Sequence, residues 1–205
     1  KILIALDVAH TSNKDEALAA AELFDMEEAA ATIPLKEAEI ILLYVKEALP
    51  SFEAVLQAQA DFPEDLGHVI ERRAGSILDI IKSNLEKHGA KVKKEIVSGV
   101  APHTIETVAR DEKVNLVILS QKKHKEPFYL SRVSHHVARH APVSTLILHG
   151  RGHKNHKQPA SVVVGLDGTK ICLEAAKKAL LSLNLDKNKT KIIVVHVVNV
   201  SKLIA

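Results

Sequence analysis

The chain has 205 residues and a mass of 22.4 kDa, enough for one complete α/β domain and part of a second. A hydrophobic fraction of 46% and a charged fraction of 26% exclude wholesale disorder. No apolar run approaches the roughly 20 residues of a membrane span. The net charge of +3 is unevenly distributed, since residues 120–158 carry +7 and the remainder carries −4. A single cysteine and the lack of a charged-then-apolar leader favour a cytoplasmic location.

Short apolar runs alternate with helix-like segments along the first three quarters of the chain. Runs rich in Ile, Leu and Val that end at polar residues are typical of strands buried in a parallel sheet. The predicted strands are residues 2–6, 39–45, 91–97, 115–119 and 143–148. The predicted helices are residues 15–31, 52–60, 66–88, 101–111 and 131–140. Gly89 follows the third of these helices, where a left-handed cap favours glycine. This alternation predicts an α/β fold, an open parallel sheet with helices on both faces.

The end of the chain repeats the pattern of its beginning. The matching segments are SVVVGLD (161–167) with KILIALD (1–7), and KIIVVHV (191–197) with EIILLYV (39–45). We therefore expect a complete domain at 1–150, a basic linker at 151–160 and a partial second copy, strand–helix–strand, at 161–205. A unit of this size leaves apolar sheet surface uncovered, so it is not expected to be stable alone.

Five segments in a fixed order carry a resemblance to a known family. They are ILIALD, IILLYV, SGVAPHTIETVA (98–109), NLVILS (115–120) and VSHHVARHAPVSTLIL (133–148). Together they resemble the universal stress protein family, in a tandem arrangement whose second repeat is truncated. The resemblance implies a five-stranded parallel sheet in the order 3-2-1-4-5 and a homodimer. It also implies a site for ATP or another adenine nucleotide, which some members bind between strands 1 and 4.

This chain has the residue types that the family uses to hold adenosine. In the nucleotide-binding members an Asp that ends strand 1 and a Val that ends strand 2 hold the adenosine. The resemblance assigns these roles to Asp7, with its neighbour Val8, and to Val45. The second copy has Asp167 at the position of Asp7.

The phosphate half of the site is not matched. The family cradles phosphates with glycines, because a backbone N–H approaches a phosphate most closely where no Cβ intervenes. No glycine occurs from residue 100 to residue 149. The residues at the corresponding positions are Ser120, Lys122, Lys123, Ser131 and Arg132. Either these side chains replace the cradle in a degenerate site for AMP, ADP, ATP or cyclic AMP, or the site is inactive.

Two other sequence features have the residue types of a binding site. His136 and His140 have the i, i+4 spacing that suits zinc, but the sequence places no third ligand, so we predict no metal site. The basic segment could attract nucleic acid, but aromatic residues are only 3% of the chain and offer little stacking surface. We therefore do not expect a nucleic-acid partner.

The sequence favours a non-enzymatic stress-response or regulatory protein, since no nucleophile or acid–base pair indicates turnover. Two alternatives remain open. One is a cytosolic regulatory domain of a membrane ion transporter or sensor kinase, with the parent transporter or another protein as its partner. The other is a dimerisation scaffold without a ligand, for which Asp7→Ala would leave function intact.

Overall fold

A computed structural model describes residues 1–6, 36–47, 66–121, 130–149, 161–183, 185–186 and 188–196. The predicted helices at 15–31 and 52–60 and the linker at 151–160 lie outside these ranges. The described residues up to His149 belong to one compact unit and those from Ser161 to a second. Each unit is therefore described separately.

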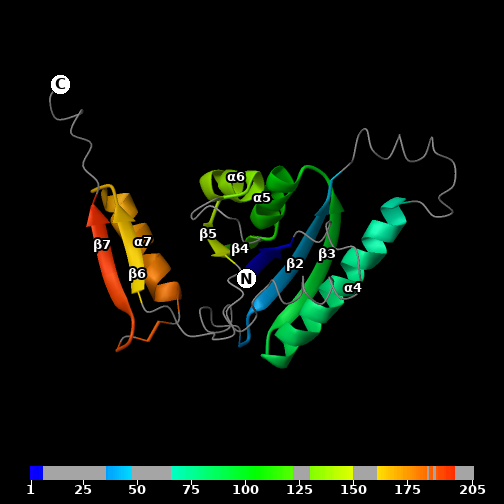
Figure 1. The fold of residues 1–205 in the computed structure, drawn as a ribbon, viewed down its shortest axis with the longest axis horizontal. Coiled ribbons are helices and arrows are strands. Elements are labelled where there is room, and N and C mark those ends of the chain that lie inside the picture. Colours follow the sequence, from blue (N-terminus) through cyan, green and yellow to red (C-terminus); the bar gives the residue numbers. More distant parts are fainter. Residues whose placement is uncertain are drawn as a thin grey trace, which may run out of the picture. The chain divides into compact units, whose positions relative to one another are not determined.

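The first unit contains an open sheet of five parallel strands (Figure 1). The strands are β1 (Ile2–Ala5), β2 (Glu39–Lys46), β3 (Lys91–Ser98), β4 (Leu116–Gln121) and β5 (Ser144–His149). Their order is β3-β2-β1-β4-β5, which confirms the predicted order. The predicted strand bounds differ from these by no more than two residues at any end.

Helices cover both faces of this sheet. The described helices of the unit are α4 (Leu66–Lys87), α5 (Ala101–Asp111) and α6 (Arg132–His140). On one face Leu3, Ile41 and Leu43 form a core with residues of α5 and α6. Ile4 and Leu42, also inaccessible to solvent, alternate to the opposite face, which α4 covers through its contacts with β2 and β3. The central strands β1 and β2 are therefore buried on both faces of the sheet.

The end of α4 confirms the role predicted for Gly89. This glycine has a φ of 87°, and its N–H donates to the carbonyl of Glu86 over 3.0 Å. The N–H of Ala90 donates to the carbonyl of Leu85 over 3.3 Å. This pair of hydrogen bonds is a Schellman motif, which satisfies two of the last helix carbonyls.

The second unit is a strand–helix–strand unit, as predicted. It consists of β6 (Ser161–Leu166), α7 (Lys170–Ser182) and β7 (Lys191–His196), with β6 and β7 parallel. Much of its apolar surface remains exposed. The exposed large apolar residues are Val163, Ile171, Leu173, Leu181, Ile192, Ile193, Val194 and Val195. None of the described helices in either unit has the length and apolarity of a membrane span.

Candidate functional site

The centre of the five-stranded sheet is a topological switch point. β1 pairs with β2 on one side and with β4 on the other, both in parallel. In open α/β sheets ligands bind outside the carboxyl ends of strands at such a point. Ala5 is in register with Leu119, so β1 and β4 run toward the same edge of the sheet. The chain continues from this edge into residues 7 and 8 after β1, and into residues 122 and 123 after β4.

The structure describes only part of the site predicted from the sequence. Asp7, Val8, Lys122 and Lys123 lie outside the described residues. Val45 lies near the end of β2, opposite Val97 of β3, and belongs to the buried core beneath α5 and α6. Ser120 lies in β4 opposite Leu148 of β5, and its side chain is outside the described part.

Ser131 and Arg132 form the beginning of α6. The Ser131 hydroxyl accepts a hydrogen bond from the backbone N–H of Ser134 over 3.1 Å and lies 3.0 Å from the Ser134 hydroxyl. Ser131 is therefore the N-cap of α6, a role worth about 1 kcal/mol to a helix. Arg132 is the first residue of the helix and is exposed to solvent.

A second cap, at the same edge of the sheet, fixes the start of α5. Glu47 follows β2, and its carboxylate accepts a hydrogen bond from the backbone N–H of Ala101 over 2.8 Å. The loop between β3 and α5 is tight, since a Cβ on Gly99 would lie 2.5 Å from the Thr104 hydroxyl oxygen. Glu47 was not singled out in the sequence, because its partner is 54 residues away.

In the second unit, the residue that repeats Asp7 forms a turn. The Asp167 carboxylate accepts hydrogen bonds from the backbone N–H of Thr169 over 2.9 Å and from its hydroxyl over 2.7 Å. Thr169 in turn caps α7, because its hydroxyl accepts from the N–H of Cys172 over 3.1 Å. The backbone and hydroxyl donors of Thr169 lower the pKa of Asp167 below its ordinary value of 3.8.

We expect the second unit to lose part of its stability in acid. Because the pKa of Asp167 is lower in the folded chain, its contribution is present above pH 3.8 and is lost as pH falls through the folded pKa. The Asp167 carboxyl carbon, followed by NMR, should titrate below 3.8. Asp167→Asn, which keeps an acceptor but no charge, should reduce the acid dependence of unfolding. Some dependence should remain, since hydrogen bonding to Asn188 also lowers the pKa of Asp186. An Asp167 titration at or above 3.8 would contradict the turn geometry.

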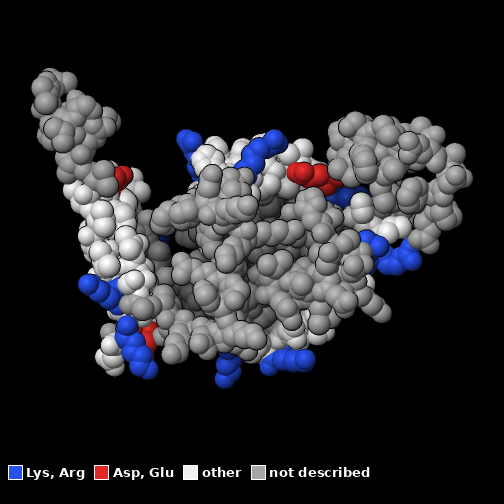
Figure 2. All heavy atoms as spheres, in the orientation of Figure 1, with Lys and Arg blue, Asp and Glu red and all other residues white. Residues whose placement is uncertain are grey.

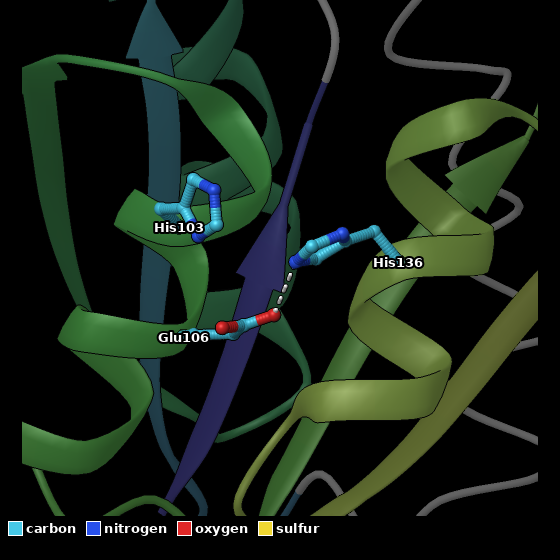
Figure 3. A group of neighbouring side chains, drawn as sticks. All are labelled: His103, Glu106 and His136. Atoms are coloured by element: carbon cyan, nitrogen blue, oxygen red, sulfur yellow. Dashed lines mark ion pairs between the residues drawn. The ribbon is translucent and has the colours of Figure 1, made fainter.

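A cluster of three side chains lies between α5 and α6 (Figure 3). His136 Nε2 lies 3.3 Å from Glu106 Oε1, and the rings of His103 and His136 meet edge to face with centroids 5.0 Å apart. One ligand-type atom from each residue lies within 4.8 Å of the other two. Among the described residues, these three side chains bring ligand-type atoms together, whereas the sequence analysis considered only His136 and His140 and predicted no metal site. His140 Nδ1 instead lies 2.9 Å from the backbone carbonyl oxygen of His136.

Figure 2 shows charged side chains of the described residues. Lys and Arg side chains lie there in small separate groups, with Asp and Glu among them. Most of the basic residues between 120 and 158 lie outside the described residues, and Arg132 and Arg139, which are described, are exposed.

Comparison with known proteins places this geometry in a family. The sequence model of the universal stress protein family matches residues 1–149. The chain belongs to this family. The match spans the whole five-stranded sheet, whereas β6, α7 and β7 lie beyond it, so their origin as a second family repeat stays a prediction. Among curated proteins no significant sequence match exists.

Several solved structures share the universal stress protein fold. The hypothetical protein MJ0577 is 25% identical with a TM-score of 0.52, over 74% of this chain and 96% of that one. The universal stress protein UspA from Lactobacillus plantarum is 20% identical with a TM-score of 0.47, over 72% and 95% of the two chains. A universal stress protein family protein from Arabidopsis thaliana, whose structure has AMP bound, is 12% identical with a TM-score of 0.48, over 74% and 92%.

Proposed function

We propose that this chain is a non-enzymatic, cytoplasmic regulatory protein of the universal stress type. It acts as a homodimer and binds an adenine nucleotide at the carboxyl ends of β1 and β4. The observation that carries the proposal is the parallel pairing of β1 with both β2 and β4, within a family-matched sheet. That pairing supports a ligand site at this edge, next to the residues that the family pattern assigns to adenosine.

The adenosine side of the proposed site consists of Asp7, Val8 and Val45. The turn at Asp167 supports a binding role for Asp7. In the second unit the Asp carboxylate accepts the hydroxyl of Thr169, but the first copy has Ala9 two residues after Asp7. Alanine has no hydroxyl to donate, so residue 9 does not offer the partner that Thr169 gives Asp167, and a ribose hydroxyl is the partner proposed for Asp7.

The phosphate side rests on cationic side chains and not on a glycine cradle. Ser131 already caps α6, so its hydroxyl is engaged with the helix. Lys122, Lys123 and Arg132, together with Ser120, are the remaining phosphate contacts. Exposed cations bind phosphate weakly and in a salt-dependent way. AMP and cyclic AMP carry one phosphate. Without the glycine cradle they should therefore lose less binding affinity than ADP and ATP do.

Calorimetric titration with ATP, ADP, AMP and cyclic AMP, at low and moderate salt, tests the proposal. We expect binding that weakens with salt, is abolished in Asp7→Ala and is reduced in Lys122→Ala/Lys123→Ala. The matched control is Lys154→Ala/Lys157→Ala, which removes the same charge from the linker and should leave affinity unchanged. No phosphate release from ATP is expected. If folded protein binds none of the four nucleotides, the nucleotide site is refuted and the scaffold alternative is favoured.

The homodimer is tested separately by sedimentation velocity. β5 forms one edge of the described sheet, and an edge strand offers unpaired N–H and C=O groups to a second chain. We expect a dimer whose formation does not depend on Asp7. A chain that stays monomeric at high concentration would remove dimerisation from the proposal without affecting the nucleotide test.

A further inference from the structure

We propose that His103, Glu106 and His136 form a binding site for a divalent transition metal, with zinc as the best-suited ion. Two imidazoles and one carboxylate form a ligand set that zinc accepts, with the fourth position left to water. Imidazole nitrogen also suits Cu, Fe and Ni, so ligand type alone does not select the ion. None of these three residues is among the proposed nucleotide contacts, so the metal proposal does not depend on nucleotide binding.

The helices bring the three side chains together. His103 and Glu106 are three residues apart on α5, a spacing that puts both on one side of a helix. His136 faces them from α6 (Figure 3). Ile105 of α5 and Val137 of α6, each next to a proposed ligand, are at most 3% exposed in the common core. Both helices are therefore held against the sheet, and packing fixes the spacing of the backbone segments that carry the ligands.

The distances are close to those that a tetrahedral ion requires. With metal–ligand bonds of about 2.1 Å, the ligand atoms of a tetrahedral zinc site are about 3.4 Å apart. His136 Nε2 and Glu106 Oε1 are already 3.3 Å apart. His103 belongs to the same group, whose ligand atoms all lie within 4.8 Å of one another. It is exposed to solvent, so a small side-chain rotation brings its ring nitrogen into place.

Glu106 gives an independent reason to expect a cation here. Its side chain is only 13% exposed, and among the described residues its Oε1 atom is buried without a hydrogen-bond partner. His136 Nε2 is within ion-pair distance of this oxygen but does not form a hydrogen bond with it. A buried carboxylate oxygen without such a bond is destabilising. A bound metal ion supplies the missing interaction without requiring a protonated His136.

The test is a calorimetric titration of Zn²⁺ into chelator-treated full-length protein, near neutral pH and without a polyhistidine tag. We expect one tight site. Removing even an outer partner of a metal ligand typically weakens affinity by about 10–100-fold. His103→Ala, Glu106→Gln and His136→Ala should therefore each weaken binding by at least that factor. His135→Ala is the matched control, because His135 neighbours His136 on α6 but is exposed and outside the cluster. It should leave affinity unchanged.

Two further measurements separate this site from the other histidines of the chain. His140→Ala should retain tight Zn²⁺ binding, because His140 is not one of the three proposed ligands. Loss of binding in this variant would instead indicate a site formed by His136 and His140. Co²⁺ substituted for zinc should give the intense visible absorption of a four-coordinate ion, and Glu106→Gln should diminish it. Circular dichroism establishes that each variant is folded. No tight Zn²⁺ binding, or binding that persists unchanged in His103→Ala and Glu106→Gln, overturns the proposal.

Discussion

Replacing Leu43 with alanine is expected to lower the free energy of unfolding of the first unit by about 2–5 kcal/mol. Leu43 has no solvent exposure and lies in the core between the sheet and the helices α5 and α6. It pairs with Ala5 of β1 on one side and Glu95 of β3 on the other. Truncating it removes buried methyl groups and leaves a cavity that strands held on both sides cannot close.

The effect is measured by chemical and thermal unfolding, followed by circular dichroism. Leu181→Ala in α7 is the matched control, since the same atoms are removed from a side chain that is 86% exposed. That change is expected to stay within about 0.5 kcal/mol of the parent protein. If the two variants unfold alike, the burial of β2 described above is wrong.

The strands and helices could be predicted from the sequence because their apolar residues are spaced differently. IILLYV (40–45) is a continuous apolar run, and these residues of β2 are buried on both faces. α4 instead shows the helical spacing of its buried residues Ala74, Ile77, Leu78, Ile81 and Leu85. The strand order followed only from the family resemblance, since periodicity alone does not determine which strands are neighbours.

The candidate sites were less predictable, because they depend on contacts between distant segments. The i, i+3 pair of His103 and Glu106 was visible within SGVAPHTIETVA, but nothing in the sequence shows that His136 faces it. The i, i+4 spacing instead suggested His140 as a partner of His136. In the structure the His140 ring nitrogen Nδ1 lies beside the backbone carbonyl oxygen of His136. Ser131 was assigned to phosphate by its position in the family pattern, and in the structure its hydroxyl caps a helix.

Asp7 and Asp167 occupy matching positions in the predicted repeat, but the residues that follow them differ. Asp167 shows what this residue does when Thr169 follows it, namely stabilise the turn into a helix. Asp7 has no such hydroxyl two residues later in the sequence, since Ala9 occupies the position. Asp167 also accepts the backbone N–H of Thr169, a donor that alanine supplies equally well, so the hydroxyl is the one partner that position 9 lacks. A ribose hydroxyl is the proposed substitute, and Asp7→Ala in the nucleotide titration tests it directly.

Residues 161–205, produced as a separate peptide, are expected not to fold. A two-stranded sheet is at best marginally stable in water, and at least three strands or good helix packing are needed. Every residue of β7 is exposed, and Ile171 and Leu181 of α7 are more than 80% exposed. The apolar area that this unit buries is therefore too small to offset the conformational entropy lost on folding.

The peptide should show a disordered far-UV circular dichroism spectrum and narrow amide proton dispersion. Residues 1–150, produced in the same way, should unfold cooperatively, because both faces of their sheet are covered. Recording the peptide spectra over a range of concentrations distinguishes folding of one chain from folding by self-association, since only the second depends on concentration. A well-dispersed spectrum from monomeric peptide would show that residues 161–205 form an autonomous domain. It would also contradict the interpretation that their exposed apolar residues need a covering surface.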